Sequence, residues 1–184
     1  WLNILNLIPR TKFMGYSNLE LSGIVLSIVF NSSQVNEISE KNDCEIIFNQ
    51  TPFYAESGGQ ESDHGIIKTK DFEAIVKGCW KTNNGIFVHK IFVKKGKIKL
   101  GDKINMYVDK EIRTNLSANH SSTHILHQVL REELGPQVLQ KGSLVAPDRL
   151  RFDFSHSGSI NETQLSDIEE KINNKIRDNS SVSI

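Results

Sequence analysis

The stretch SANHSSTHILHQVLREELGP, residues 117–136, marks the change from a strand pattern to a helix pattern along this chain. Its apolar residues recur with a period of about 3.6, as on one face of a helix. They form a single stripe of Ile125, Leu126, Val129, Leu130 and Leu134. Gly135 and Pro136 then end the pattern, because glycine is favoured just after a helix and proline cannot continue one. The stretch predicts a helix over residues 117–134.

Before residue 113 the sequence has the pattern of short strands separated by turns. Runs rich in Ile, Val and Phe lie at residues 23–30, 44–49, 65–69, 72–80, 85–93 and 102–109. Clusters of Gly, Asn, Asp and Ser separate them, which is typical of a small antiparallel barrel or sandwich. Asn84-Gly85 predicts a type I′ hairpin turn, since both of its central positions need positive φ.

After the helix, the sequence alternates extended and helical patterns again. We expect extended pieces over 137–145 and 149–155, and a second helix over 161–177 with Leu165, Ile168, Ile172 and Ile176 on one face. Residues 180–184 have the pattern of the start of a further strand. The predicted fold class is α+β, a small antiparallel β-barrel followed by an α+β part.

Composition excludes several classes of protein. The 184 residues carry 22 Lys plus Arg and 22 Asp plus Glu, so that the formal net charge is zero. This balance argues against binding of duplex DNA by bulk electrostatics, although it leaves room for a local basic patch. No apolar run approaches the roughly 20 residues that span a bilayer, and no secretory signal is expected. The only cysteines, Cys44 and Cys79, favour a reducing compartment such as the cytoplasm.

The motif His120-Ser-Ser-Thr-His124 is a candidate metal site. Two histidines four residues apart lie on one helix face, which is the spacing with which a helix offers two imidazoles to one zinc ion. His127 continues the same side of the helix, at the edge of the apolar stripe. A zinc site needs three or four protein ligands, and the further candidates are His127, His156, Cys44, Cys79, His64 and His89. Two ordinary surface or core histidines remain the alternative.

Two other segments combine glycine with polar side chains. Tyr54-Ala-Glu-Ser-Gly-Gly-Gln60 contains adjacent glycines, Gly58 and Gly59, which let a backbone approach a ligand closely. Gln140-Lys-Gly-Ser143 is followed by a strand-like alternation in which Lys141, Arg149 and Arg151 could contact phosphates. The alternatives are a polar barrel turn for the first segment and a solvated strand face for the second.

A run of lysines lies near a predicted hairpin. Six fall within fourteen residues: Lys90, Lys94, Lys95, Lys97, Lys99 and Lys103. They could contact a nucleic acid backbone. Alternatively, they protect the edge of a sheet, because charged lysines discourage the addition of another strand.

Together, TPFYAESGGQESDHG (51–65) and the segment from Arg113 to His156 closely resemble the editing domain of alanyl-tRNA synthetases. RTKFMGYSNLE (10–20) resembles the segment that leads into that domain. The resemblance implies a lead-in over 1–19, a β-barrel over 20–111 and the first part of an α+β editing subdomain over 112–184. Free-standing alanyl editing proteins share the Gly-Gly-Gln and H-x-x-x-H stretches but lack the lead-in.

The resemblance also implies roles for individual residues. His120 and His124 match zinc ligands, and the C-x-x-x-H motif that supplies the other ligands in the family is absent from this sequence. Thr123 matches a position that lines the amino-acid pocket, and Gln140 matches one that influences serine editing; both are the predicted catalytic residues. Gly58, Gly59, Gln60, Lys141 and Arg151 are the predicted substrate-binding residues.

The resemblance therefore implies a region of an alanine–tRNA ligase that hydrolyses tRNA(Ala) mischarged with serine or glycine. Such editing is expected where a binding pocket cannot discriminate sufficiently between similar amino acids. The parent enzyme would join alanine to tRNA(Ala) with ATP and Mg²⁺, which would not bind here. Expected partners are tRNA(Ala), its seryl and glycyl forms and the rest of the synthetase chain, with no membrane or DNA. The alternatives are a catalytically silent tRNA-contacting module and a free-standing editing hydrolase.

Overall fold

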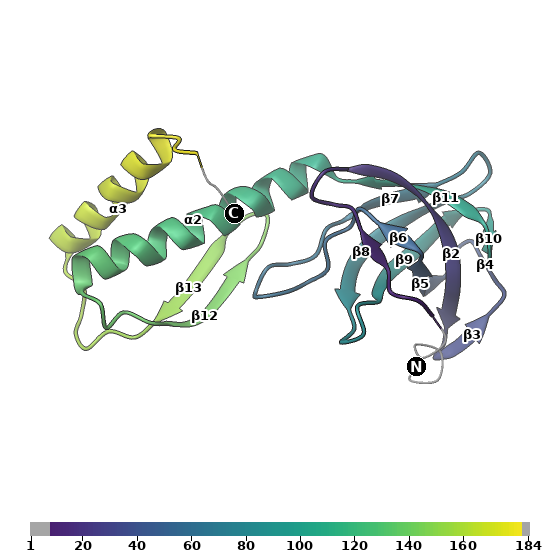
Figure 1. Cartoon of the computed structure of the whole chain (residues 1–184), viewed down its shortest axis with the longest axis horizontal. Helices are drawn as coiled ribbons and strands as arrows, with labels where there is room; N and C mark the ends of the chain where they lie inside the picture. Colours follow the sequence, from purple (N-terminus) through teal and green to yellow (C-terminus); the bar gives the residue numbers. More distant parts are fainter. Residues whose placement is uncertain (1–7, 182–184) are drawn as a thin grey trace. The chain divides into compact units, whose positions relative to one another are not determined.

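A computed structural model describes residues 8–181 (Figure 1). The chain divides into two compact units, which are described separately. The barrel unit consists of Trp1–Ser57 and Glu61–Arg113, and the helical unit consists of Gly58–Gln60 and Thr114–Ile184. Within residues 8–181, neither helix has the length and apolar character required to cross a bilayer.

Six antiparallel strands close the barrel. They are β2 (Glu20–Phe30), β5 (Asp43–Phe48), β7 (Gly65–Lys68), β8 (Glu73–Lys81), β9 (Phe87–Lys95) and β11 (Lys103–Val108). Their order is β11-β7-β8-β9-β5-β2, and pairing of β11 with β2 completes the ring. All six coincide with the Ile-, Val- and Phe-rich runs of the sequence, so that the predicted barrel and the α+β fold class are confirmed.

Five shorter strands complete the barrel unit. β3 (Ser33–Val35) pairs with β2, β1 (Lys12–Phe13) pairs in parallel with β6 (Gln50–Thr51), and β4 (Glu37–Ser39) pairs with β10 (Lys97–Lys99). The barrel core is made of alternate apolar residues on the long strands. Its fully buried members include Ile28, Phe48, Ile67, Val76 and Met106.

A buried ion pair ties the start of the long helix to the barrel loops. Arg113 donates to both carboxylate oxygens of Asp63, one of them through Nε at 2.8 Å. The Asp63 side chain has no solvent exposure and also accepts the Tyr54 N–H at 2.6 Å. The other guanidinium donors reach the carbonyls of Gly15 at 2.7 Å and Pro52 at 3.0 Å. Arg113 therefore links three separate loop segments of the barrel unit.

The helical unit packs two helices and a two-stranded sheet around a second core. Its elements are α2 (Lys110–Leu134), whose first residues belong to the barrel unit, β12 (Gln140–Val145), β13 (Leu150–Phe154) and α3 (Glu162–Arg177). The second core contains Val129, Leu130 and Leu134 from α2 and Ile168 from α3, with Phe152 of β13 packed against it. The apolar stripe that predicts the helix thus forms this core.

Helix capping explains where the two helices begin. α3 starts after Asn161, which forms a capping box: its side chain accepts the Gln164 N–H at 2.9 Å, and its own N–H donates to Gln164 Oε1 at 3.1 Å. The predicted start of α2 at residue 117 is wrong. Asp109 Oδ1 accepts the N–H groups of Glu111 and Ile112, so that the helix begins at Lys110.

Two other local predictions concern the turn at Asn84-Gly85 and a strand at the end of the sequence. The type I′ turn at Asn84-Gly85 is wrong, because only Gly85 has positive φ, at 80°. A longer β8–β9 connection forms instead, in which the Gly85 N–H donates to the Thr82 carbonyl at 2.9 Å. The strand predicted over residues 180–184 lies largely outside the described residues.

Candidate active site of the helical unit

His120 and His124 meet on the exposed side of α2. They lie one helical turn apart, with ring centroids separated by 5.1 Å. Their Nε2 atoms approach to 3.2 Å. The two imidazoles therefore share a helix face, as the spacing in the sequence predicts, and their Nε2 atoms converge.

A glutamine from the glycine-rich loop contacts the first of these histidines. Gln60 Oε1 lies 2.6 Å from His120 Nδ1, although the two residues are 60 positions apart. Gln60 is only 7% exposed. Its backbone forms a parallel bridge with Val145, and the Gly59 carbonyl accepts the Val145 N–H at 2.8 Å. The loop 58–60 thus extends the β12–β13 sheet beside α2.

A cavity of about 80 Å³ lies between α2, β12 and this loop. The residues that line it are Gly58, His120, Thr123, His124, Gln140, Ser143 and Val145. Five of these seven residues are ones that the sequence singles out, although they come from three separate segments. Ser143 and Val145 were not predicted as site residues. Of these two, only Ser143 could have been predicted, from its position in the QKGS stretch.

Hydrogen bonds fix the walls of the cavity. Thr123 is 8% exposed, and its hydroxyl donates to the Asn119 carbonyl at 2.8 Å, which locks its rotamer. Gln140 is exposed and donates from Nε2 to Ser143 Oγ at 3.1 Å. The Ser143 hydroxyl lies 3.4 Å from the Gly58 carbonyl. The cavity therefore has one rigid wall, at Thr123, and one polar, solvent-facing wall, at Gln140.

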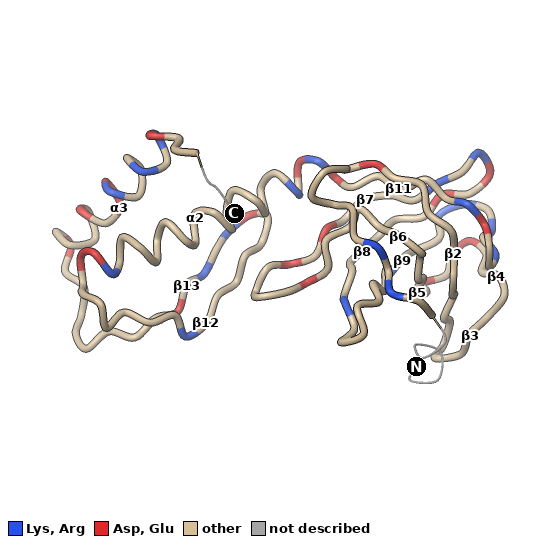
Figure 2. The backbone as a smooth tube through the Cα atoms, in the orientation of Figure 1, with Lys and Arg blue, Asp and Glu red and all other residues tan. Residues whose placement is uncertain are grey.

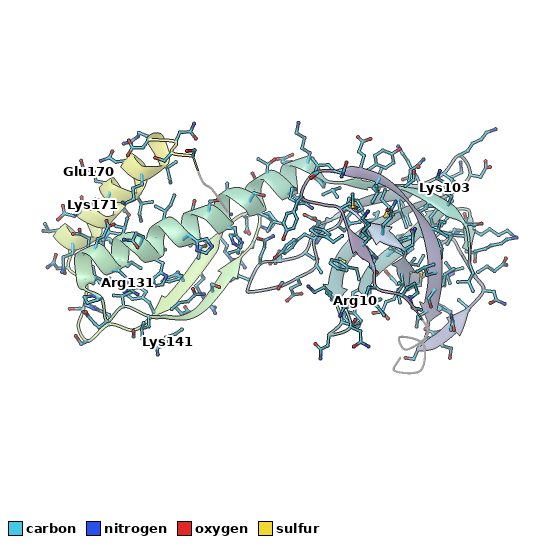
Figure 3. The ribbon with its side chains drawn as sticks, in the orientation of Figure 1. Arg10, Lys103, Arg131, Lys141, Glu170 and Lys171 are labelled. Atoms are coloured by element: carbon cyan, nitrogen blue, oxygen red, sulfur yellow. The ribbon has the colours of Figure 1, made fainter. Side chains whose placement is uncertain are left out.

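The two predicted basic contacts lie on the sheet but do not line the cavity. Lys141 is exposed at an irregularity of β12, where the register shifts between Gln140 and Gly142 (Figure 3). The Arg151 side chain is 67% exposed and lies 3.2 Å from Asp153. Their exposure suits contact with a large ligand that extends beyond the cavity.

The further metal-ligand candidates do not join the histidine pair. Among residues 8–181, no group of three or more His, Cys, Asp or Glu side chains is arranged to hold a metal ion. His127 Nε2 and His156 Nδ1 are buried and have no hydrogen-bond partner among the described residues. The His127 ring packs against Phe152 at 5.1 Å between centroids. His127 thus packs against Phe152 at the second core.

Three of the four candidates in the barrel unit, His89, Cys44 and Cys79, are buried. His89 is completely buried, and its nitrogens contact Thr51 Oγ1 at 2.7 Å and the Ile46 carbonyl at 3.1 Å. Burial lowers the pKa of His89 to about 4, so that it stays neutral. Burial, with Asp43 and Glu45 nearby, raises the pKa of Cys44 to about 12.

Comparison with known proteins decides the family. The sequence model of the tRNA synthetases class II (A) matches residues 1–112, more than half of the chain. The chain belongs to this family. The match ends just before Arg113, so that it includes Gly58, whereas the other residues that line the cavity of this synthetase chain lie beyond it.

The similarity of this synthetase chain to individual relatives extends over nearly its whole length. It is 44% identical over 182 residues to the alanine–tRNA ligase of Chelativorans sp. strain BNC1 and 45% identical over 183 residues to that of Rickettsia felis, in each case over 99% of the chain. Identity to the alanine–tRNA ligase of Listeria monocytogenes is 44% over 93% of the chain. The chain spans only about a fifth of the length of these relatives, 20–21%. The resemblance to alanyl-tRNA synthetases is confirmed.

The histidine pair fits two positions of a zinc site. Zinc–nitrogen bonds of 2.0–2.1 Å in a tetrahedron place two ligand nitrogens about 3.3 Å apart. The observed Nε2–Nε2 separation of 3.2 Å matches this value. His120 also has a hydrogen-bond acceptor at its other nitrogen, as zinc-bound histidines nearly always do. The pair supplies two ligands, fewer than the three or four of a typical zinc site.

Proposed function

We propose that this chain is the editing region of an alanine–tRNA ligase and hydrolyses the ester that joins serine or glycine to the terminal ribose of tRNA(Ala). The observation that carries the proposal is the cavity that gathers His120, Thr123, His124 and Gln140 beside the glycine-rich loop. The names of the relatives extend the proposal to the whole protein, which would attach alanine to tRNA(Ala) with ATP and Mg²⁺. On this proposal the protein acts in the cytoplasm.

The size of the cavity suits a small amino-acid side chain. About 80 Å³ corresponds to two or three water molecules at roughly 30 Å³ each. Thr123 cannot rotate away without losing its bond to the Asn119 carbonyl. Its hydroxyl oxygen still has a lone pair that can accept a hydrogen bond from a serine hydroxyl. The Thr123 wall would thus recognise the group that distinguishes serine from alanine.

The polar wall would orient the ester. Gln140 is held by Ser143 through one amide N–H, and its second N–H can donate to an ester carbonyl. A donor placed there would stabilise the charge that develops on the carbonyl oxygen during attack by water. His120 and His124 would hold zinc, which when bound supplies Lewis-acid polarisation or an activated water. Lys141 and Arg151, exposed on the same sheet, would contact tRNA phosphates.

Substitutions that keep the shape of the site test this proposal. In a full-length synthetase that contains this sequence, Thr123→Val and Gln140→Ala should each slow the hydrolysis of seryl-tRNA(Ala) at least tenfold, about 1.4 kcal/mol. Alanine charging should stay within a factor of two. Gln128→Ala is a matched control, since Gln128 is exposed on the same helix and its side chain donates to Glu132 at 3.0 Å. Unchanged deacylation of seryl-tRNA(Ala) in both variants would show that Thr123 and Gln140 do not have the roles proposed for them.

The lysine run favours a second candidate function, that of a silent tRNA-contacting module. All six lysines are exposed, and Figure 2 shows basic and acidic residues interspersed around β4, β10 and β11. Edge protection does not explain Lys90, because β9 is paired on both sides at that position. Glu73 and Glu37 lie 3.8 Å and 3.7 Å from Lys94 and Lys97.

This second function predicts tRNA binding without ester hydrolysis. The affinity would weaken steeply as salt rises, because each phosphate contact releases counterions. Replacement of Lys90 and Lys103 by alanine should weaken binding and lower the salt dependence. Measurable turnover of seryl-tRNA(Ala), or binding insensitive to salt, would exclude it.

A further inference from the structure

Gln60 contacts Nδ1 of His120 and thereby bears on which nitrogen of that ring carries a proton. An amide oxygen can only accept a hydrogen bond, so that the 2.6 Å contact between Gln60 Oε1 and His120 Nδ1 requires a proton on Nδ1. A neutral imidazole has one N–H, and the other nitrogen then carries a free electron pair. In neutral His120 this free pair is on Nε2, the atom 3.2 Å from His124 Nε2.

The glycine-rich loop fixes Gln60 in this position. A Cβ at Gly59 would lie 2.4 Å from the Ser143 carbonyl oxygen, and φ at Gly59 is +84°, so that only glycine fits without a shift. This close approach lets the Gly59 carbonyl accept the Val145 N–H at 2.8 Å. The backbone of β12 therefore holds the next residue, Gln60, against α2, and its 7% exposure shows that the side chain does not extend into solvent.

We infer that Gln60 is a positioning residue, which acts through His120 and does not contact the substrate. Its amide oxygen holds His120 in the Nδ1–H tautomer and orients the Nε2 electron pair toward His124. At 3.2 Å, His124 Nε2 donates its hydrogen to this electron pair in the metal-free chain, and both Nε2 atoms can bind a divalent metal ion once that proton moves to the other nitrogen of His124. The role of this tautomer in metal binding rests on the proposed function, whereas the tautomer itself is a property of the metal-free chain.

The alternative is that Gln60 only fills space beside the helix. Its side chain would then be replaceable by an apolar one of similar size, and His120 would choose its tautomer without it. The two cases differ in a measurement that needs neither substrate nor metal. Nitrogen chemical shifts of labelled histidine distinguish protonated from unprotonated ring nitrogens.

The test is ¹⁵N NMR of the metal-free full chain labelled at histidine. We expect the Nδ1–H form of His120 in the parent chain and in Gln60→Glu, because a carboxylate also accepts from Nδ1. In Gln60→Leu we expect a mixture with the Nε2–H form. Gln128→Ala, on the exposed face of the same helix, should leave the signal unchanged. An unaltered His120 tautomer in Gln60→Leu, with a folded spectrum, would overturn the inference.

Zinc titration gives a second readout. Loss of a hydrogen bond to a metal-bound histidine typically weakens binding roughly 10-fold to 100-fold. Gln60→Leu should show a loss of this size, and Gln60→Glu should bind zinc at least as tightly as the parent chain. Equal affinity in the parent chain and Gln60→Leu would overturn the inference. A parent chain that binds no zinc would instead overturn the proposed metal site, and the tautomer signal would still decide the role of Gln60.

Discussion

Arg113 neutralises a carboxylate that has no contact with water, and its replacement by methionine should destabilise the barrel unit by about 3–5 kcal/mol. The Asp63 side chain is fully buried and receives two of the Arg113 hydrogen bonds. Methionine keeps an unbranched apolar side chain but removes the charge and the donors to Gly15 and Pro52. Among the described hydrogen bonds to its side chain, the variant leaves Asp63, a buried charge, with the Tyr54 N–H.

Urea unfolding measures this loss. We would follow Trp80 fluorescence in a Trp1→Phe background, so that the signal reports on strand β8 of the barrel unit. A loss of about 4 kcal/mol at a slope of about 2 kcal/mol/M lowers the midpoint by about 2 M. Lys97→Met is the matched control, because the Lys97–Glu37 pair lies in the same unit and has side chains 59% and 54% exposed. Its cost should stay below about 1 kcal/mol.

A second substitution separates the charge from the packing. Asp63→Asn keeps an oxygen for the Tyr54 N–H but removes the buried negative charge. Arg113→Met combined with Asp63→Asn should therefore be more stable than Arg113→Met alone. A cost below 1 kcal/mol for Arg113→Met, or a double variant that is no more stable than the single one, would refute the reasoning.

Three further predictions concern other parts of the chain. Gly59→Ala should speed amide exchange at Val145, because the new Cβ would displace the loop from β12. At Gly58 a Cβ would meet nothing within 4 Å, so that Gly58→Ala should cost only the roughly 1–2 kcal/mol of a left-handed residue. Equal amide exchange at Val145 in both variants would contradict this. The buried thiols Cys44 and Cys79, whose pKa values burial raises, should react with a thiol reagent only after unfolding; rapid labelling of the native chain would contradict this. The folded-state pKa of His89 is about 4, below the usual 6.5, so that only the unfolded state gains this proton as the pH falls from 6.5 to 4. Stability should drop by about 3 kcal/mol over that range, at about 1.4 kcal/mol per pH unit; a pH dependence equally steep in His89→Gln would contradict this.

The sequence predicts features that depend on near neighbours. The barrel strands can be predicted because runs such as residues 44–49 are rich in apolar and β-branched residues. The core face of α2 can be predicted from the spacing of Val129, Leu130 and Leu134. The start of α2 was missed because its cap, Asp109, lies eight residues before the predicted start. The residues between show no apolar period strong enough to reveal a helix.

The periodicity and spacing of residues do not predict contacts between distant segments. The sequence suggests Gln60 and His120 separately, but it contains no signal that pairs them across 60 positions. Likewise, the spacing of His120 and His124 predicts a shared helix face but not that both Nε2 atoms converge. These pairings depend on how loop 58–60 lies against β12, which the absence of a side chain at Gly59 permits.

The most direct test of the proposed site is the rate at which a full-length synthetase containing this sequence hydrolyses seryl-tRNA(Ala), measured with and without the double substitution His120→Ala and His124→Ala. Both histidines are exposed on α2, so that their loss should leave the second core intact. We expect hydrolysis in the double variant to fall to the uncatalysed rate while alanine charging is retained. Hydrolysis at the parent rate in the double variant would contradict this expectation.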